Sequence, residues 1–208
     1  MRLKNIVWTA ALIVSAVLLT ALISTATVGA EDADGVAEPK TVSGNAAGDP
    51  AKATQIARGK YLVDIMGCHD CHTPMKMGPK GPEWDMTRAL SGHLEEMVMP
   101  PAPAPAGPWV ASIAATFTAF ASPAGTVFTR NLTPDKETGL GDWTVEEFIA
   151  TMKTGRERGK GRPVMPPMPV QNLAALSDPD IRALFAYLQS LPAIKNRTPQ
   201  PIEPAEPK

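Results

Sequence analysis

The sequence lacks a strong net charge, an internal repeat and any cysteine outside one short stretch. Its 208 residues carry 20 basic and 21 acidic side chains, a formal net charge of −1. A chain this close to neutral has no general attraction for nucleic acid, so we expect no nucleic-acid partner. No stretch shows a convincing alternation of apolar and polar residues, which would predict strands, so the expected fold class is mainly α.

Both cysteines, Cys68 and Cys71, lie in the stretch MGCHDCHTP, together with two of the three histidines. Three chemistries use cysteines at this spacing. The thiols could cycle with a disulfide, the thiolates could hold zinc, or the thiols could add to the vinyl groups of haem. Only haem attachment requires a histidine directly after the second cysteine, where His72 lies. The motif C-x-x-C-H therefore favours covalently attached haem c, and its single occurrence predicts one haem.

The other two chemistries have less support in the sequence. A thiol–disulfide protein of the thioredoxin type would alternate strands and helices, and the sequence does not. Zinc held by Cys68, Cys71 and His72 would need the distant His93 as its fourth ligand. His69, between the cysteines, is expected to be exposed, because haem attachment uses only one histidine.

The first 30 residues have the features of an export signal. Arg2 and Lys4 precede an uncharged run at positions 6–23, and small residues at 28–30 offer a cleavage site. The run is nearly long enough to span a bilayer, so residues 1–30 are predicted to be a signal peptide or an N-terminal membrane anchor. Positive charge before the run predicts a periplasmic protein, soluble or tethered to the outer face of the plasma membrane. No cysteine follows the run, so a lipoprotein anchor is not indicated.

Composition divides the remaining chain into three parts. Residues 31–50 are rich in Gly, Ala, Asp and Pro and are predicted to be a flexible linker. Residues 193–208 are rich in proline and are predicted to be a disordered tail. One domain is expected at 51–192. From Glu31 onward there are 18 basic and 21 acidic residues, because only the basic Arg2 and Lys4 precede it, so this part is slightly acidic.

Capping residues and apolar spacing predict three helices, at about residues 49–66, 144–155 and 177–191. The first has its expected apolar face at Ile56, Tyr61, Leu62, Ile65 and Met66. Gly59 inside it costs about 1 kcal/mol relative to alanine, which suggests close approach by another helix. Between the first two helices, residues 73–129 are expected to form a long irregular Pro-rich insertion whose aromatic side chains pack on the domain.

Three segments resemble the class I c-type cytochromes over about residues 53–195: GCHDCHTP, NLTPDKETGLGDWTVEEFIATMKTG and PPMPVQNLAALSDPDIRALFAYLQSLP. The resemblance is strongest to bacterial domains that act as electron carriers or as cytochrome subunits of periplasmic dehydrogenases. It implies a small cytochrome c-type helical haem domain in which the first and last helices cross, around Gly59–Tyr61 and Leu184–Tyr187.

The resemblance also implies the roles of the site residues. Cys68 and Cys71 would bind the haem vinyl groups, and His72 would be the proximal iron ligand. Met168, in P-P-M-P ten residues before Asp178, would be the distal ligand. Met165 also precedes a proline and is the alternative methionine. His93 is the alternative distal ligand if the ligand is not a methionine.

A His/Met-ligated haem implies one-electron transfer rather than catalysis. The expected partners are redox proteins: a periplasmic dehydrogenase, an oxidase or another cytochrome. One alternative is a gas sensor or weak peroxidase, if Met168 dissociates readily; another is a cytochrome subunit of a dehydrogenase complex.

Asn131 is expected to anchor a turn or to bind a haem propionate. The strip Lys153–Arg162 has five basic residues against Glu157, a local net charge of +4, and is either a solvated loop or a surface that steers an acidic partner.

Overall fold

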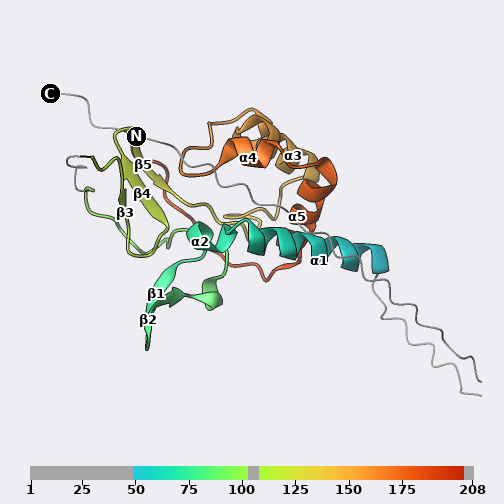
Figure 1. Cartoon of the computed structure of the whole chain (residues 1–208), viewed down its shortest axis with the longest axis horizontal. Coiled ribbons are helices and arrows are strands. Elements are labelled where there is room, and N and C mark those ends of the chain that lie inside the picture. The colour runs from blue at the N-terminus through green and yellow to red at the C-terminus, as the bar shows by residue number, and fades with distance from the viewer. Residues whose placement is uncertain (1–48, 103–107, 204–208) are drawn as a thin grey trace, which may run out of the picture. The chain divides into compact units, whose positions relative to one another are not determined.

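The structure is a computed structural model that describes residues 49–102 and 108–203 (Figure 1). The helices are α1 (Pro50–Ile65), α2 (Cys68–His72), α3 (Val145–Thr154), α4 (Val170–Ala174) and α5 (Asp178–Ser190), with 3-10 turns η1 (Met86–Arg88) and η2 (Glu157–Gly159). The strands are β1 (Met75–Gly78), β2 (Gly81–Trp84), β3 (Ser112–Ile113), β4 (Ala119–Ser122) and β5 (Gly125–Phe128). The predicted export segment 1–30 and linker residues 31–48 lie outside the described residues.

The three predicted helices are confirmed as α1, α3 and α5, and side-chain caps explain where they begin. The Asp49 carboxylate accepts a hydrogen bond from the amide of Ala51 at 3.0 Å, at the start of α1. At α3, the Thr144 hydroxyl accepts from the amide of Glu147 while the Glu147 carboxylate accepts from the amide of Thr144, a complete capping box. Within the described parts of the chain, no helix is long and apolar enough to cross a membrane.

Helices α1 and α5 lie against each other (Figure 1), and at position 59 their crossing leaves no room for a side chain. A Cβ on Gly59 would overlap the carbonyl oxygen of Ala183 and lie 2.7 Å from the Cβ of Tyr187. The close approach predicted from Gly59 is therefore confirmed. The apolar core forms around this crossing and comprises Leu62, Val63, Leu90, Leu140, Phe148, Ile181, Ala183, Leu184 and Leu188.

Replacing Gly59 with alanine is expected to destabilise the domain. Alanine favours a helix by about 1 kcal/mol over glycine, but overpacking costs about 1–3 kcal/mol, and here the obstacle is main chain that cannot rotate away. We expect a net loss in the free energy of unfolding of about 1–2 kcal/mol in a urea titration of the haem-loaded protein. Gln55→Ala, at an exposed position of the same helix, should change it by less than about 0.5 kcal/mol. A Gly59→Ala protein as stable as the parent would contradict the tight crossing.

The buried face of α1 differs from the predicted one. Tyr61 and Ile65 are exposed, by 53% and 59%, whereas Leu62 and Val63 are buried. The close contact at Gly59 explains this shift, because it turns positions 59, 62 and 63 toward α5. The helical period was predicted correctly, but its phase was not.

The described part of residues 73–129, which excludes 103–107, contains five strands, so the expectation of no strands was wrong. Strands β1 and β2 form an antiparallel hairpin, and β3, β4 and β5 form an antiparallel sheet in that order. Each strand has four residues or fewer, which is too short for apolar alternation to be seen in a sequence. The aromatic residues pack less than expected: Phe128 is buried, but Trp109 is 75% exposed and Phe117 is 44% exposed.

The segment 193–203 is packed on the domain, which corrects the prediction of a disordered tail from residue 193. Asn196 is 3% exposed, and its amide nitrogen donates to the carbonyl oxygens of Ser91 at 2.7 Å and His93 at 2.8 Å. Further on, Ile202 pairs with Thr126 of β5 through two main-chain hydrogen bonds. The prolines indicated a segment without helix or strand, but the buried Asn196 and the bridge at Ile202 attach it to the domain. Residues 204–208 lie outside the described residues.

Candidate functional site

Helix α2 carries the whole C-x-x-C-H motif directly after α1. Gly67 joins the two helices with a φ of 66°, in the left-handed region that glycine tolerates best. Cys68 and Cys71 are free thiols and are partly buried. Because they are three residues apart on a helix, both side chains lie on the same face, as attachment to one planar ligand requires.

The environment of the two thiols does not suit disulfide exchange. Burial raises the pKa of Cys68 to about 11, and burial also raises the pKa of Cys71. Both groups are therefore neutral thiols near pH 7. Redox-active dithiols have the opposite property, a lowered pKa that supplies the thiolate nucleophile. This observation opposes the thiol–disulfide alternative.

The imidazole of His72 is buried and held in one orientation. The side chain is 8% exposed, and Nδ1 lies 2.8 Å from the carbonyl oxygen of Arg130. A carbonyl can only accept, so Nδ1 carries the proton and Nε2 keeps its lone pair. Burial lowers the pKa of His72, which favours the neutral ring. A neutral imidazole fixed through Nδ1 is the state in which Nε2 binds a metal.

These residues fit a covalently attached haem. Two neutral thiols on one helix face can form two thioether links, and the next residue presents an unprotonated nitrogen. Cys68 packs against the apolar core, as do the partly buried Met66, Leu132 and Trp143. The surroundings therefore offer the apolar contacts that a porphyrin ring needs.

The two candidate methionines lie in the loop between η2 and α4. Met165 is 36% exposed, whereas Met168 is partly buried. The amide of Val164 donates to the carbonyl of Gly155 at 2.8 Å, and the amide of Val170 donates to that of Met168 at 2.9 Å. The first bond fastens the loop ahead of Met165, and the second forms a turn at Met168 itself. The lower exposure of Met168 suits a ligand to a buried group better than that of Met165.

His93 is not available as a ligand. Its side chain is fully buried, Nδ1 lies 2.9 Å from the Thr118 hydroxyl, and Nε2 lies 3.2 Å from the carbonyl oxygen of Met97. Both ring nitrogens are therefore occupied. No group of three or more His, Cys, Asp or Glu residues within 49–102 and 108–203 is arranged to hold a metal ion. Neither the zinc alternative nor the His93 alternative for iron is supported.

His69 and Asn131 are both more engaged than predicted. His69, expected to be exposed, is partly buried, with Nδ1 2.8 Å from the Thr73 hydroxyl. Asn131 does anchor a turn, because its side-chain oxygen accepts from the amide of Thr133 at 2.9 Å. Its amide nitrogen donates to the carbonyl of Ile194 at 2.8 Å and to the Thr138 hydroxyl at 3.1 Å. Both amide hydrogens are thus used, which leaves none for a haem propionate.

The buried state of His93 predicts a dependence of stability on pH. Burial lowers the pKa of His93 in the folded protein. The stability that the neutral ring contributes is therefore complete above its unfolded value of about 6.5 and is lost as the pH falls through the lower folded value. Between pH 8 and pH 5, the haem-loaded parent should lose more unfolding free energy than His93→Gln, by up to about 1.4 kcal/mol per pH unit. Identical losses in urea titrations of the two proteins would contradict this assignment.

The basic strip Lys153–Arg162 is largely neutralised by its surroundings. Lys153 lies 3.4 Å from Asp178, and Arg162 lies 3.1 Å from Glu157. Arg158 bridges Glu147 at 2.7 Å and Asp142 at 2.9 Å and covers the ring of Trp143. Among the residues that the structure describes, only Arg156 and Lys160 of this strip form no ion pair. The effective charge of the strip is therefore smaller than its sequence suggests.

Comparison with known proteins gives the family. The family model for "Cytochrome c" matches residues 56–192, about two thirds of the chain. The chain belongs to the cytochrome c family. Its cofactor is covalently attached haem c, and Cys68 and Cys71 with His72 fit the C-x-x-C-H attachment motif; its function is electron transfer.

Several curated relatives of this cytochrome are subunits of dehydrogenases. It is 40% identical over 141 residues to the gluconate 2-dehydrogenase cytochrome c subunit of Pantoea cypripedii, with 68% of this chain and 24% of the relative aligned. It is 30% identical over 159 residues to the cytochrome c subunit of the quinone-dependent alcohol dehydrogenase of Gluconobacter oxydans, with 75% and 26% aligned. The fructose dehydrogenase cytochrome subunit of Gluconobacter japonicus is 33% identical over 161 residues, with 74% and 26% aligned. The chain thus spans about a quarter of the length of these relatives.

Proposed function

We propose that this cytochrome accepts single electrons from a dehydrogenase and passes them to the next redox carrier, with its haem iron ligated by His72 and Met168. The observation that carries the proposal is the state of His72. Its Nδ1 donates to the carbonyl of Arg130, which leaves the lone pair of Nε2 for a ligand, and two neutral thiols precede it on the same short helix. Such an arrangement suits one covalently held, histidine-ligated haem.

The chain contributes fixed ligands and exclusion of water. The haem supplies a one-electron Fe(III)/Fe(II) couple when bound. Prolines on both sides of Met168 limit the backbone and hold its thioether at one place. A thioether ligand favours the reduced state, and burial of the positive charge acts in the same direction, so we expect a positive midpoint potential. If His72 and Met168 both held the iron, the chain would leave no position on it for a substrate, which suits electron transfer.

The proposed donor is a dehydrogenase, because dehydrogenase subunits recur among the relatives. The proposed place is the periplasmic side of the plasma membrane, supported by the export features of residues 1–30. Affinity purification of the tagged protein from native membranes tests the partner. We expect a dehydrogenase catalytic subunit in a fixed ratio and reduction of the haem when that enzyme's substrate is added. Co-purification with an oxidase alone, or haem that stays oxidised, would contradict the donor.

The two cations of the strip that form no ion pair are the proposed contacts for an acidic donor. The main chain of Arg156 pairs with that of Pro163 in an isolated β-bridge. Pro163 lies two residues before Met165, so Arg156 is close to the start of the loop that carries Met165 and Met168. Complementary charge speeds encounter and is screened by salt. Arg156→Glu with Lys160→Glu should slow second-order reduction by the donor about 3–10-fold at low ionic strength and leave the midpoint potential unchanged.

Lys52→Glu with Lys80→Glu, at two exposed positions, is the matched double charge reversal outside the strip and should have a smaller effect on the stopped-flow rate. Arg158→Glu is unsuitable as a test, because it would also break the ion pairs with Asp142 and Glu147. A rate that is insensitive both to the double reversal and to ionic strength would reduce the strip to a solvated loop.

A further inference from the structure

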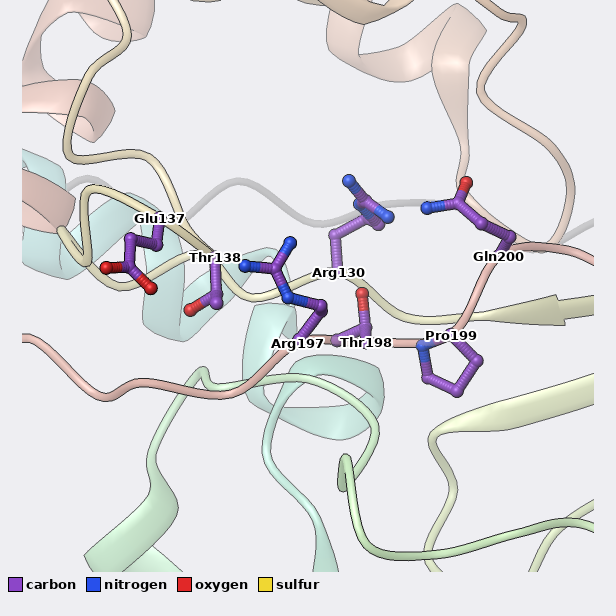
Figure 2. Close-up of a pocket in the computed structure, with 7 residues that line it drawn as sticks. All are labelled: Arg130, Glu137, Thr138, Arg197, Thr198, Pro199 and Gln200. Atoms are coloured by element: carbon purple, nitrogen blue, oxygen red, sulfur yellow. The ribbon is translucent and has the colours of Figure 1, made fainter.

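A cavity of about 260 Å³ lies where the segment after Lys195 crosses the loop that follows β5 (Figure 2). The side chains of Arg130, Arg197 and Gln200 line it, together with the Thr198 hydroxyl. Figure 2 shows the guanidinium groups of Arg130 and Arg197 extending to the same side, with the amide of Gln200 directed toward Arg130. None of the roles derived above uses these three side chains.

Positive charge exceeds negative charge around this cavity. The carboxylate of Glu157 is 3.5 Å from Arg130, but it is also 3.1 Å from Arg162 and is therefore shared by two guanidinium groups. Glu137 lines the cavity but is paired with Lys195 at 2.9 Å. Arg197 forms no ion pair with any residue that the structure describes. The residues that line the cavity thus carry two guanidinium groups, of Arg130 and Arg197, and the carboxylate of Glu137, a local net charge of +1.

The guanidinium of Arg130 is short of negative charge. Its side chain is 41% exposed, and its ion pair with Glu157, at 3.5 Å, is longer than the 3.1 Å pair between Glu157 and Arg162. A half-buried cation beside another cation costs free energy unless an anion is near. An anion placed between Arg130 and Arg197 would supply the compensating negative charge that Glu157 provides only in part.

The third donor is already oriented. The side-chain oxygen of Gln200 accepts a hydrogen bond from Arg162 at 3.0 Å, which fixes the amide. Its nitrogen is then left to donate, and in Figure 2 the amide is directed toward Arg130. The Thr138 hydroxyl, in contrast, is used up, because it donates to Asp135 and accepts from the amides of Asn131 and Asn196.

We propose that this cavity binds a small oxyanion, of the phosphate or carboxylate type, between the guanidinium groups of Arg130 and Arg197 and the amide of Gln200. Arginine donates paired hydrogen bonds to such anions with matching geometry, and these charge-assisted bonds are about twice as strong as neutral ones. The proposed ligand is a bound ion and not a substrate, and the proposed contacts come from outside the C-x-x-C-H motif.

The site is also connected to His72. The carbonyl oxygen of Arg130 accepts the hydrogen bond from His72, so one residue contacts both the cavity and the proximal ligand. A negative charge at this position favours the oxidised iron, and reciprocity then requires the oxidised protein to bind the anion more tightly. This coupling rests on the proposed function, whereas anion binding does not.

Titration calorimetry of the haem-loaded protein with inorganic phosphate, at constant ionic strength set by chloride, tests the site. We expect saturable binding of one phosphate per chain, at least tenfold weaker in Arg197→Gln. Arg182→Gln removes an arginine of α5 that pairs with Glu146 outside the cavity, and it should bind phosphate as the parent does. Acetate in place of phosphate shows whether a carboxylate is accepted. Phosphate heats equal to those of chloride, or equal in parent and Arg197→Gln, would overturn the site.

Redox titration with and without phosphate tests the coupling. Threefold tighter binding to the oxidised protein would lower the midpoint potential by about 28 mV at saturation, from 59 mV per tenfold for one electron. Arg197→Gln should remove this shift, and Arg182→Gln should retain it. Phosphate binding without a shift in the midpoint potential would overturn the proposed coupling, and the proposed binding site would still stand. Because calorimetry does not depend on the iron ligands, a failure of the His72/Met168 assignment would not affect the binding result.

Discussion

Met168→Ala is expected to remove the thioether-to-ferric charge-transfer band and to lower the midpoint potential of the haem by well over 59 mV, which is more than a tenfold change in the one-electron equilibrium. The thioether stabilises reduced iron, and its loss leaves water or a stronger donor in its place. Visible spectroscopy and redox titration measure the two effects. The same variant should bind carbon monoxide rapidly in the reduced state, because the chain would then supply only His72 to the iron.

Met165→Ala is the matched control, because Met165 lies in the same loop and also precedes a proline. It should leave the band and the potential unchanged. Reversed outcomes for the two variants would exchange the roles of the two methionines. Rapid binding of carbon monoxide to the unmodified protein would instead favour the gas-binding or peroxidase alternative, in which Met168 dissociates readily.

Replacing both Cys68 and Cys71 by serine should eliminate covalent haem entirely. Each thiol can form one thioether, so a single substitution should leave one link or none and lower the amount of accumulated protein. Haem absorbance that remains with the polypeptide after denaturation and acid extraction measures this. His69→Ala is the control inside the motif, because His69 contacts Thr73 and is not needed for attachment. Covalent haem in the double variant would show that another residue forms the link.

The sequence predicted the parts of the fold that depend on local rules. Caps such as Asp49 and the pair Thr144 and Glu147 act over a few residues, so they could be found without knowledge of the tertiary structure. The short strands of residues 73–129 could not, because their pairing joins segments whose own patterns are too brief to detect. The packed segment at Asn196 was missed for a related reason: its hydrogen bonds reach residues more than 100 positions earlier.

The site shows the same division. The spacing of Cys68, Cys71 and His72 in the sequence was enough to predict the chemistry of attachment. The partner of His72 was not predictable in this way, because it is the main-chain carbonyl of Arg130, and every residue has such a group. The ion pairs that neutralise much of the basic strip were also invisible, since they involve Asp142, Glu147 and Asp178 from outside it.

The mass of the intact, denatured protein, produced in cells that export it and attach haem, tests the central claim most directly. The account predicts the polypeptide mass plus that of one haem, which denaturation does not remove. Protein expressed in the cytosol without the attachment machinery should show the polypeptide mass alone. An exported protein with the bare polypeptide mass, or with two hydrogens fewer because Cys68 and Cys71 have formed a disulfide, would contradict the account.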